Sequence, residues 1–382
     1  MVAQFRAGAA MRAVARAYAV SLSTVQWWVR RAGDRALDQV EWDDRPPLAK
    51  QIHRTASAVE DVVLTLRREL KDTSDLGEYG ARAIHHALTA CARSPVPSVR
   101  TIGRILARRG ALDAARRLRR PPPPSGWYLP AVAGRRAELD SFDTIEGLAL
   151  EGGVQLEVLT VVSLHGGLPG AWPQPLVTAK TAVGALVEHW RMFGLPTYAQ
   201  FDNDSIFTGT HRWRDALGRV VRTCLHLGVI PVFAPPQESG FQAAIENFNG
   251  RWQAKVWARF HHDSLEELHV RSHRYLSAYR ARAATRIETA PERRSFPAAW
   301  WPDLQTPHGV VIFIRRTSET GTVTLLGRPF VVAPLWPHRL VRCELDLDAQ
   351  TIRFHALRRR APTDQPLLQE IPYVFPSKPF YE

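Results

Sequence analysis

The chain has 382 residues, 45% of them hydrophobic, with a formal net charge of +13 at pH 7. This length is too great for one ordinary domain, and the apolar content excludes a disordered chain, so we expect a multidomain globular protein. The excess of positive charge indicates a polyanionic partner, with nucleic acid ahead of a membrane surface.

The cysteines and the hydropathy pattern exclude two further classes of protein. Cys91, Cys224 and Cys343 stand far apart and form no CxxC pair, which argues against a disulfide framework and against a zinc site. No apolar stretch reaches the roughly 18 residues that a membrane span requires. The first residues also lack the layout of a signal peptide, so we expect an intracellular protein without membrane contact.

Residues 1–40 predict a small helical unit. An Ala-rich helix is followed by a turn with a capping serine and then by a second helix, along which Val25, Trp28 and Val29 share the inward face. This pattern resembles a helix-turn-helix, whose second helix enters the major groove of DNA. The outward side chains that would contact DNA are Thr24, Gln26, Trp27 and Arg30.

A second helical unit is predicted for residues 57–120, between a linker over 41–56 and a Pro-rich linker over 121–134. Its last helix has a second pattern of the helix-turn-helix kind, with an apolar face and an Arg-rich face. Arginine suits phosphate and guanine contacts, so we expect this unit also to bind DNA. The expected contacts are Arg100, Thr101, Arg104 and Arg108.

Residues 135–265 predict a third unit, in which three strands are followed by alternating helices and strands. Three carboxylates stand out in this unit. Asp202 follows a short buried strand, and Glu246 lies on a polar stripe beside the apolar face of a helix. A first strand carries both Asp140 and Asp143, and alternation places these two on opposite faces of the sheet, so only one can join Asp202.

The motifs around these carboxylates resemble those of the retroviral-integrase superfamily, which includes bacterial insertion-sequence transposases. Asp202-Asn203-Asp204 is similar to the family's Asp-Asn-Gly motif, and Glu246-Asn-Phe-Asn249 is similar to its Glu-Arg-Phe-Asn motif. The resemblance implies an RNase H-like α/β core with a mixed five-stranded sheet. Asp204 departs from the family glycine, and we interpret it as a turn residue.

The resemblance also implies an Asp-Asp-Glu triad that binds two Mg²⁺ or Mn²⁺ ions per active site. We expect the catalytic and metal-binding residues to be Asp140, Asp202 and Glu246, with Asp143 as the alternative first aspartate. Arg251 and Lys255 continue the helix of Glu246 and are expected to contact DNA phosphates.

The C-terminal third predicts a helical connector over 266–305, a small β unit over 306–360 and a Pro-rich tail over 361–382. Short strands separated by turn residues are typical of a small barrel. Integrase-type proteins often carry an SH3-like module at this place, so the resemblance implies a barrel that binds DNA.

These expectations together describe a DNA transposase or integrase that cleaves and transfers DNA strands of a mobile element. Its partners would be double-stranded DNA, both the element ends and the target, and further copies of itself in a homo-oligomer. Its location would be the cytoplasm, on the nucleoid of a bacterial-type cell. Two alternatives stay open: a DNA-binding regulator without catalysis, and an RNase H-like nuclease acting on RNA–DNA hybrids.

Overall fold

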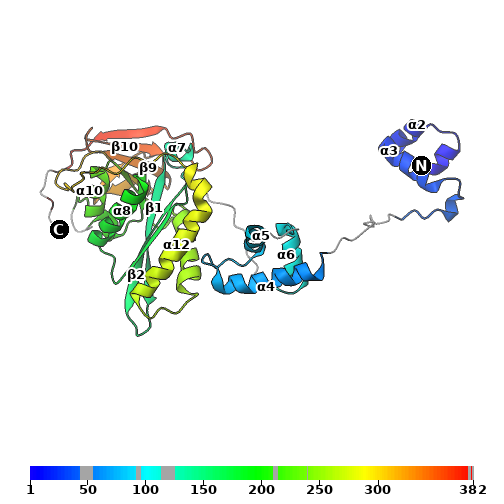
Figure 1. The fold of residues 1–382 in the computed structure, drawn as a ribbon. Helices are drawn as coiled ribbons and strands as arrows, with labels where there is room; N and C mark the ends of the chain where they lie inside the picture. Colours follow the sequence, from blue (N-terminus) through cyan, green and yellow to red (C-terminus); the bar gives the residue numbers. More distant parts are fainter. Residues whose placement is uncertain are drawn as a thin grey trace. The chain divides into compact units, whose positions relative to one another are not determined.

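The computed structural model describes residues 1–43, 55–91, 96–112, 125–209, 214–238, 240–376 and 380. The chain divides into two compact units, Met1–Glu60 and Asp61–Glu382, which are described separately below. Figure 1 shows the helices of the N-terminal segments and the large sheet formed by the C-terminal part of the chain. In the described part of the chain, no helix is both long enough and apolar enough to cross a membrane.

The first unit is a cluster of three short helices with a small apolar core. The helices are α1 (Val2–Arg6), α2 (Met11–Ala17) and α3 (Leu22–Ala32). The Ser21 side chain caps α3 by accepting a hydrogen bond of 3.1 Å from the backbone N–H of Thr24. Val25 of α3 is fully buried against Val14 of α2, as the apolar spacing predicts.

Three more helices share a separate apolar core. They are α4 (Ser57–Thr73), α5 (Ala81–Ala90) and α6 (Val99–Arg108). Ser98 caps α6 through a 3.2 Å hydrogen bond from the Thr101 N–H. The buried side chains are Val63, Ile84, Leu88, Ile102, Ile105 and Leu106. The last three form the predicted apolar face of α6.

One continuous nine-stranded sheet dominates the second unit, in the order β11-β10-β9-β6-β5-β4-β1-β2-β3. β2 is antiparallel to β1 and β3, whereas β4, β5 and β6 are parallel to their neighbours β1, β4 and β5. The strands of the predicted core are β1 (Leu139–Ala149), β2 (Gln155–Ser163), β3 (Pro169–Gln174), β4 (Tyr198–Phe201) and β5 (Ile230–Phe233).

The C-terminal strands extend this sheet, which contradicts the predicted five-stranded sheet with a separate small barrel. β6 (Val310–Arg316) pairs with β5, and β9 (Leu340–Asp346), β10 (Thr351–Ala356) and β11 (Leu367–Pro372) follow it. β11 lies inside the segment predicted to be a loose tail. β7 (Thr322–Leu325) and β8 (Arg328–Val331) form a two-stranded ribbon of their own.

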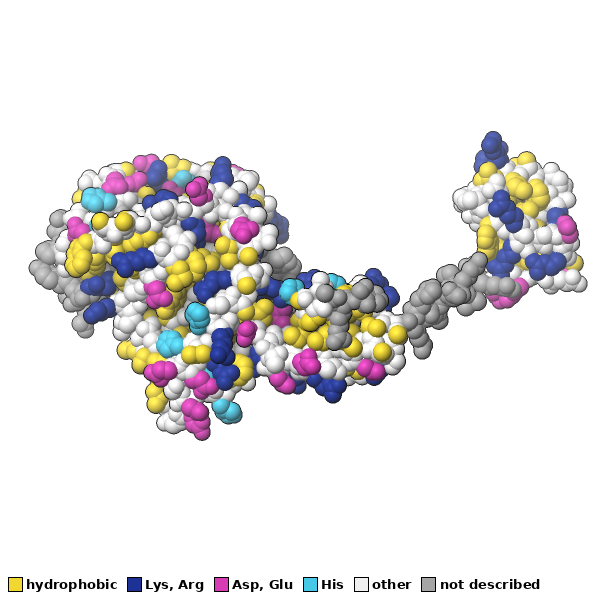
Figure 2. Space-filling view, viewed as in Figure 1, with side chains coloured by type: hydrophobic (Ala, Val, Ile, Leu, Met, Phe, Trp, Pro, Cys, Tyr) yellow, Lys and Arg dark blue, Asp and Glu magenta, His cyan; other side chains and the backbone are white. Residues whose placement is uncertain are grey.

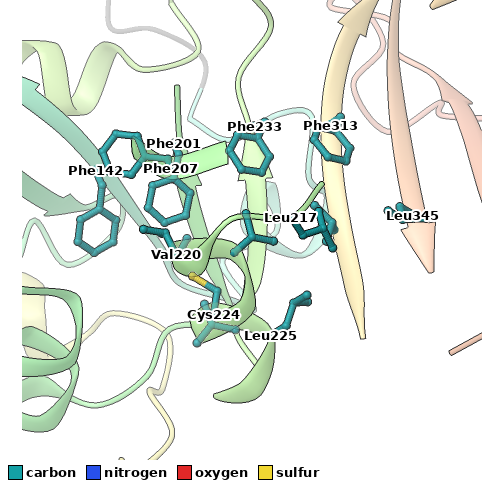
Figure 3. Packing of buried hydrophobic residues seen from close by; sticks show 14 of the residues in the cluster. Phe142, Phe201, Phe207, Leu217, Val220, Cys224, Leu225, Phe233, Phe313 and Leu345 are labelled. Atoms are coloured by element: carbon teal, nitrogen blue, oxygen red, sulfur yellow. The ribbon is translucent and has the colours of Figure 1, made fainter. Parts of the chain in front are cut away.

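A row of phenylalanine rings across four strands explains why these strands join the core. The rings of Phe142 and Phe201 stack at 5.4 Å, and those of Phe233 and Phe313 stack at 5.2 Å. Figure 3 shows these rings side by side along the sheet, above Val220 and Cys224. A separate barrel would leave the Phe233 and Phe313 faces exposed to water, and joining the sheets buries both.

Helices cover both faces of the sheet, in the α/β layout expected of an RNase H-like core. α8 (Ala179–Phe193) and α10 (Arg219–His226) pack on the face that carries Phe142. α11 (Ala243–Trp252) and α12 (Leu265–Glu288) pack on the face that carries Ile145. A π-helical turn over Gln253–Trp257 continues α11, and the short helices are α7 (Pro130–Ala133) and α9 (Ser205–Thr208).

Candidate functional site

Asp143 is a half-buried carboxylate in the middle of β1, on the face covered by α11. The side-chain amide of Asn249 donates a hydrogen bond of 2.8 Å to its Oδ2 atom. The hydroxyl of Thr160 on β2 lies 2.7 Å from Oδ1 of Asn249 and 3.0 Å from the Asp143 carbonyl oxygen. Asp143 is therefore held by side chains from the neighbouring strand and from α11.

Asp202 follows the last residue of β4, at the C-terminal edge of the sheet. Its Oδ1 atom accepts a 3.0 Å hydrogen bond from the backbone N–H of Asp204. Burial raises the pKa of Asp202, that hydrogen bond opposes the rise, and the Asp204 carboxylate adds to it. Asp204 itself caps α9 by accepting a 2.7 Å bond from the Ile206 N–H, which agrees with its predicted place in the turn.

Glu246 lies in the first turn of α11, with an exposed side chain next to the buried Ile245 and Phe248. Its negative charge acts on Asp143 of β1. The pKa of Asp143 is raised to about 6, first by burial and then by the negative charges of Asp202 and Glu246. The structure therefore places Asp202, at a strand end, and Glu246, on a helix, within electrostatic reach of Asp143 on β1.

Asp140, the predicted first carboxylate, lies elsewhere, on the other face of β1. It is fully buried, and Arg293 donates bonds of 2.9 and 2.6 Å to its two oxygens while the Trp190 ring N–H donates a third of 3.0 Å. Burial alone would raise its pKa, but the Arg293 charge and these bonds hold the pKa of Asp140 below its usual value. Both of its oxygens accept hydrogen bonds within the protein, so Asp143, the predicted alternative, is the candidate first carboxylate.

The chemistry of this donor set fits a hard divalent cation. Carboxylate oxygens are the ligands that Mg²⁺ prefers, and a nearby cation would relieve the repulsion that adds to the effect of burial on the pKa of Asp143. Within the described residues, no three His, Cys, Asp or Glu side chains are already close enough together to hold one metal ion. The charges of Asp202 and Glu246 thus act on Asp143, but the three side chains do not form a set of metal ligands in this conformation.

Asn249 is a site residue that the sequence analysis did not identify. It is buried, and its amide joins Thr160 to Asp143. It lies one helical turn after Glu246, so both residues face the same edge of the sheet. The available signal was its place on the polar stripe of α11, but a stripe does not show which polar residue contacts the strand.

The predicted DNA contacts of the first helical unit lie on α3. Trp27 and Arg30 are exposed, and Thr24 and Gln26 are half-buried. Trp27 is also in contact with Arg31, whose guanidinium lies 5.1 Å from the centre of its ring.

The other predicted DNA contacts lie in the compact unit Asp61–Glu382, on α6 and on the helix of Glu246. Arg100, Arg104 and Arg108 of α6 are exposed and Thr101 is half-buried. Arg251 is exposed on α11, but Lys255 donates a 3.0 Å hydrogen bond to the Gly77 carbonyl, so its ammonium already binds the protein. Figure 2 shows Lys and Arg side chains spread over the visible surface and interspersed with acidic ones.

The comparisons with known proteins give similarity at the level of structure alone. No family model and no curated protein matches the chain. The catalytic core of BIV integrase is 15% identical with a TM-score of 0.27, over 37% of this chain and 81% of that one. The magnesium complex of the HTLV-2 integrase core in its trimeric form is 11% identical with a TM-score of 0.27, over 36% and 81%.

A chain of the simian T-cell lymphotropic virus intasome, solved with the PP2A regulatory subunit B56 gamma, is 12% identical with a TM-score of 0.34. This match covers 76% of the present chain and 92% of that one. Because all three TM-scores lie below 0.5, we base the function on the strand order and the side chains of this protein.

Proposed function

We propose that the protein is a DNA transposase or integrase that cleaves and joins DNA strands with divalent metal ions. One observation carries the proposal: the negative charges of Asp202 and Glu246 act on Asp143 and add to the effect of its burial, and together they raise the pKa of Asp143 to about 6. Grouped carboxylates of this kind are the usual means of holding the cations that drive phosphodiester chemistry. The motifs that flank Asp202 and Glu246 support the same assignment.

Each carboxylate has a distinct structural role. Asp143 is fixed by Asn249, and Asp202 is fixed by the Asp204 N–H, so these two would form the rigid part of a metal site. Glu246 is exposed, so its side chain can turn toward the aspartates without disturbing the core. Two bound Mg²⁺ or Mn²⁺ ions would supply activation of the attacking hydroxyl and stabilisation of the leaving oxygen.

Double-stranded DNA is the proposed partner, with the two helical units reading the element ends. The exposed Arg30 on α3 and Arg104 on α6 would contact phosphates or bases, and the capping serines fix where each helix begins. Two ends must be brought together for joining, so we propose a homo-oligomer. The proposed location is the cytoplasm, on the nucleoid of a bacterial-type cell.

A strand-transfer assay tests the proposal. Purified protein is given labelled DNA that carries the ends of its own element, with Mg²⁺ or Mn²⁺, beside Asp143→Asn, Asp202→Asn and Glu246→Gln. We expect metal-dependent joining by the unchanged protein and a loss of at least about a thousandfold in each variant, as for residues that act as a unit. The matched control is Asp204→Asn, which removes a neighbouring carboxylate but keeps a side chain that caps α9.

The other outcomes separate the alternatives. DNA binding without cleavage by the unchanged protein would replace the proposal with a DNA-binding regulator. Cleavage of RNA–DNA hybrids without joining would replace it with a nuclease. Full activity of Asp143→Asn would show that these carboxylates are not the active site.

A further inference from the structure

Arg315 is a half-buried arginine that lines a cavity on the face of the sheet covered by α10. The cavity has a volume of about 240 Å³ and lies at the C-terminal ends of β4, β5 and β6. Its lining includes the Arg315 guanidinium, the Asn203 amide and apolar side chains such as Phe233, Phe313 and Leu217. Arg315 follows Phe313 by two positions, so both side chains leave β6 on the face covered by α10.

Two neighbours hold the guanidinium in one orientation. Its NH2 group donates a 2.8 Å hydrogen bond to Oδ1 of Asn203, and its NH1 group donates a 2.9 Å bond to the Ile314 carbonyl. Asn203 is fixed in turn, because its amide nitrogen donates a 2.7 Å bond to the Ala234 carbonyl at the end of β5. The arginine is therefore preorganised by groups that are neutral.

Arg315 differs from two other inward-facing arginines, Arg293 and Arg342, in having no acidic partner. Arg293 pairs with Asp140, and Arg342 pairs with Glu344 at 2.9 Å. Over the described ranges, no Asp or Glu lies within ion-pair distance of Arg315, and its Nε–H donates no hydrogen bond. Burial lowers the pKa of Arg315 to about 10, which still leaves the group charged at neutral pH.

A charged group that is withdrawn from water without a counter-ion is unfavourable, so its retention in a cavity indicates an anionic ligand. The position of the cavity identifies which anion. Asn203, which binds Arg315, directly follows Asp202 of the candidate site, so an anion on Arg315 would lie at the same edge of the sheet as that site, on the face covered by α10. The planar guanidinium, whose Nε–H donates no hydrogen bond within the described residues, suits the geometry of phosphate oxygens.

We propose that Arg315 and its cavity bind a phosphodiester of the DNA backbone next to the strand being cleaved. This inference rests on the proposed function, because it takes DNA as the substrate of the carboxylate site. It also gives the C-terminal strands a part in the site, since β6 carries the arginine to the edge of the sheet.

The test is DNA binding measured in a chelator, where catalysis does not take place. Affinity for a short duplex that carries an element end is followed against salt concentration for the unchanged protein, Arg315→Gln, Arg315→Lys and Arg316→Gln. Arg316 is the matched control, because it is the adjacent residue, is exposed and pairs with Glu238. Arg316→Gln removes the same charge from the other side of β6.

We expect Arg315→Gln to weaken binding roughly tenfold and to reduce the salt slope by about 0.9, the value for one lost phosphate contact. Arg316→Gln should leave the slope unchanged. Arg315→Lys keeps a charge that reaches a phosphate, so it should retain the slope, which a misfolded variant would not do. Equal effects of Arg315→Gln and Arg316→Gln, or an unchanged slope in Arg315→Gln, would overturn the proposal.

A second arm locates the phosphate and identifies its source. Duplexes in which single phosphates are replaced by neutral methylphosphonates should show a position where binding weakens for the unchanged protein but not for Arg315→Gln. If orthophosphate alone stabilises the protein through Arg315 and no such position exists, the cavity binds a free anion and the DNA assignment fails. If Arg315 proves not to bind DNA, the proposed strand-transfer activity still stands. If the strand-transfer assay fails, the DNA-binding measurement can still be interpreted, because it does not depend on catalysis.

Discussion

The side-chain amide of Asn249 on α11 donates a 2.8 Å hydrogen bond to the carboxylate of Asp143 on β1. The bond connects the helix that carries Glu246 with the strand that carries the first carboxylate. It favours the ionised form of Asp143, whereas burial and the neighbouring charges favour the protonated form. Asn249 therefore sets both the orientation and the charge of a proposed metal ligand.

The first prediction concerns Asn249→Ala and the pH dependence of strand transfer. Loss of the hydrogen bond raises the pKa of Asp143, and a ligand must be ionised to bind metal. The acid limb of the rate profile should therefore move to higher pH, by about one unit if the bond is worth roughly 1 kcal/mol. Asn247→Ala, at an exposed position on the same helix, is the control and should leave the profile in place. A uniform loss of rate at all pH values would contradict the assigned role.

The second prediction concerns the stability of the metal-free protein. The folded pKa of Asp143 is raised to about 6 from an ordinary value of 3.8, so its contribution to stability is present below the ordinary value and is lost as the pH rises toward 6. The loss is at most about 3 kcal/mol. Asp143→Asn should remove this fall when unfolding by denaturant is compared between pH 4 and pH 7. In the unchanged protein, Mg²⁺ or Mn²⁺ should recover stability at pH 7, and identical pH profiles of the two proteins would refute the proposal.

The third prediction concerns the ion pair between Asp140 and Arg293. Asp140→Asn leaves the Arg293 guanidinium without its partner, so we expect the free energy of unfolding to fall by roughly 3–5 kcal/mol. The double variant with Arg293→Met should be destabilised by less than the sum of the single variants, because the unpaired charge is then absent. Thermal and denaturant unfolding measure both quantities. An Asp140→Asn protein that is as stable as the unchanged protein but inactive would indicate that Asp140 is a catalytic residue.

The Asp140–Arg293 pair also determines how the stability of the fold changes at low pH. The pKa of Asp140 is held low in the fold, so the stability it contributes is lost as the pH falls through that lowered value. His189 contributes in the same direction, because burial lowers its pKa to about 4 and the folded ring stays neutral where the unfolded ring takes up a proton. Both effects oppose that of Asp143, so the Asp143 contribution must be measured as a difference between variants.

The fourth prediction concerns a chain that ends at residue 305. An independent barrel could be removed without harm to the core, but this deletion exposes the Phe233 ring and the β5 edge to water. We therefore expect the truncated protein to aggregate or to expose apolar surface to a hydrophobic dye. A soluble, cooperatively folding product would show that β6 and its partners form a module of their own.

The fifth prediction concerns recognition by α6. Arg104→Ala should weaken DNA binding and reduce its salt dependence, because an exposed arginine on this helix is proposed to contact DNA. Arg109→Ala is the matched control, since that side chain already pairs with Asp61 at 2.8 Å. Binding that responds equally to both changes would indicate general electrostatic attraction instead of a defined contact.

Local patterns were sufficient for most of the secondary structure. Asp202 follows the short buried strand β4, and Glu246 lies beside the buried face of α11, as predicted. Strand partners were harder to predict, because pairing between β5 and β6 depends on residues far apart in the chain. The stacked rings of Phe233 and Phe313 favour that pairing, but neither local sequence shows that the other ring is its partner.

The choice between Asp140 and Asp143 also depends on contacts between residues far apart in the chain. Alternation along β1 correctly places the two carboxylates on opposite faces, but it does not show which face α11 covers. The deciding residue is Arg293, which lies 153 positions after Asp140 in the chain and neutralises it. A buried aspartate with a distant arginine partner and an aspartate of an active site have the same local sequence signal.

The continuous sheet has a consequence for local unfolding near the candidate site. Because β6 hydrogen-bonds to β5 and β5 to β4, the strand that carries Arg315 and the strand that ends before Asp202 belong to one cooperative unit. Backbone amides of β4, β5 and β6 should then exchange with heavy water at a common slow rate. The C-terminal strands would thus limit how often the catalytic edge opens, although they carry none of its carboxylates.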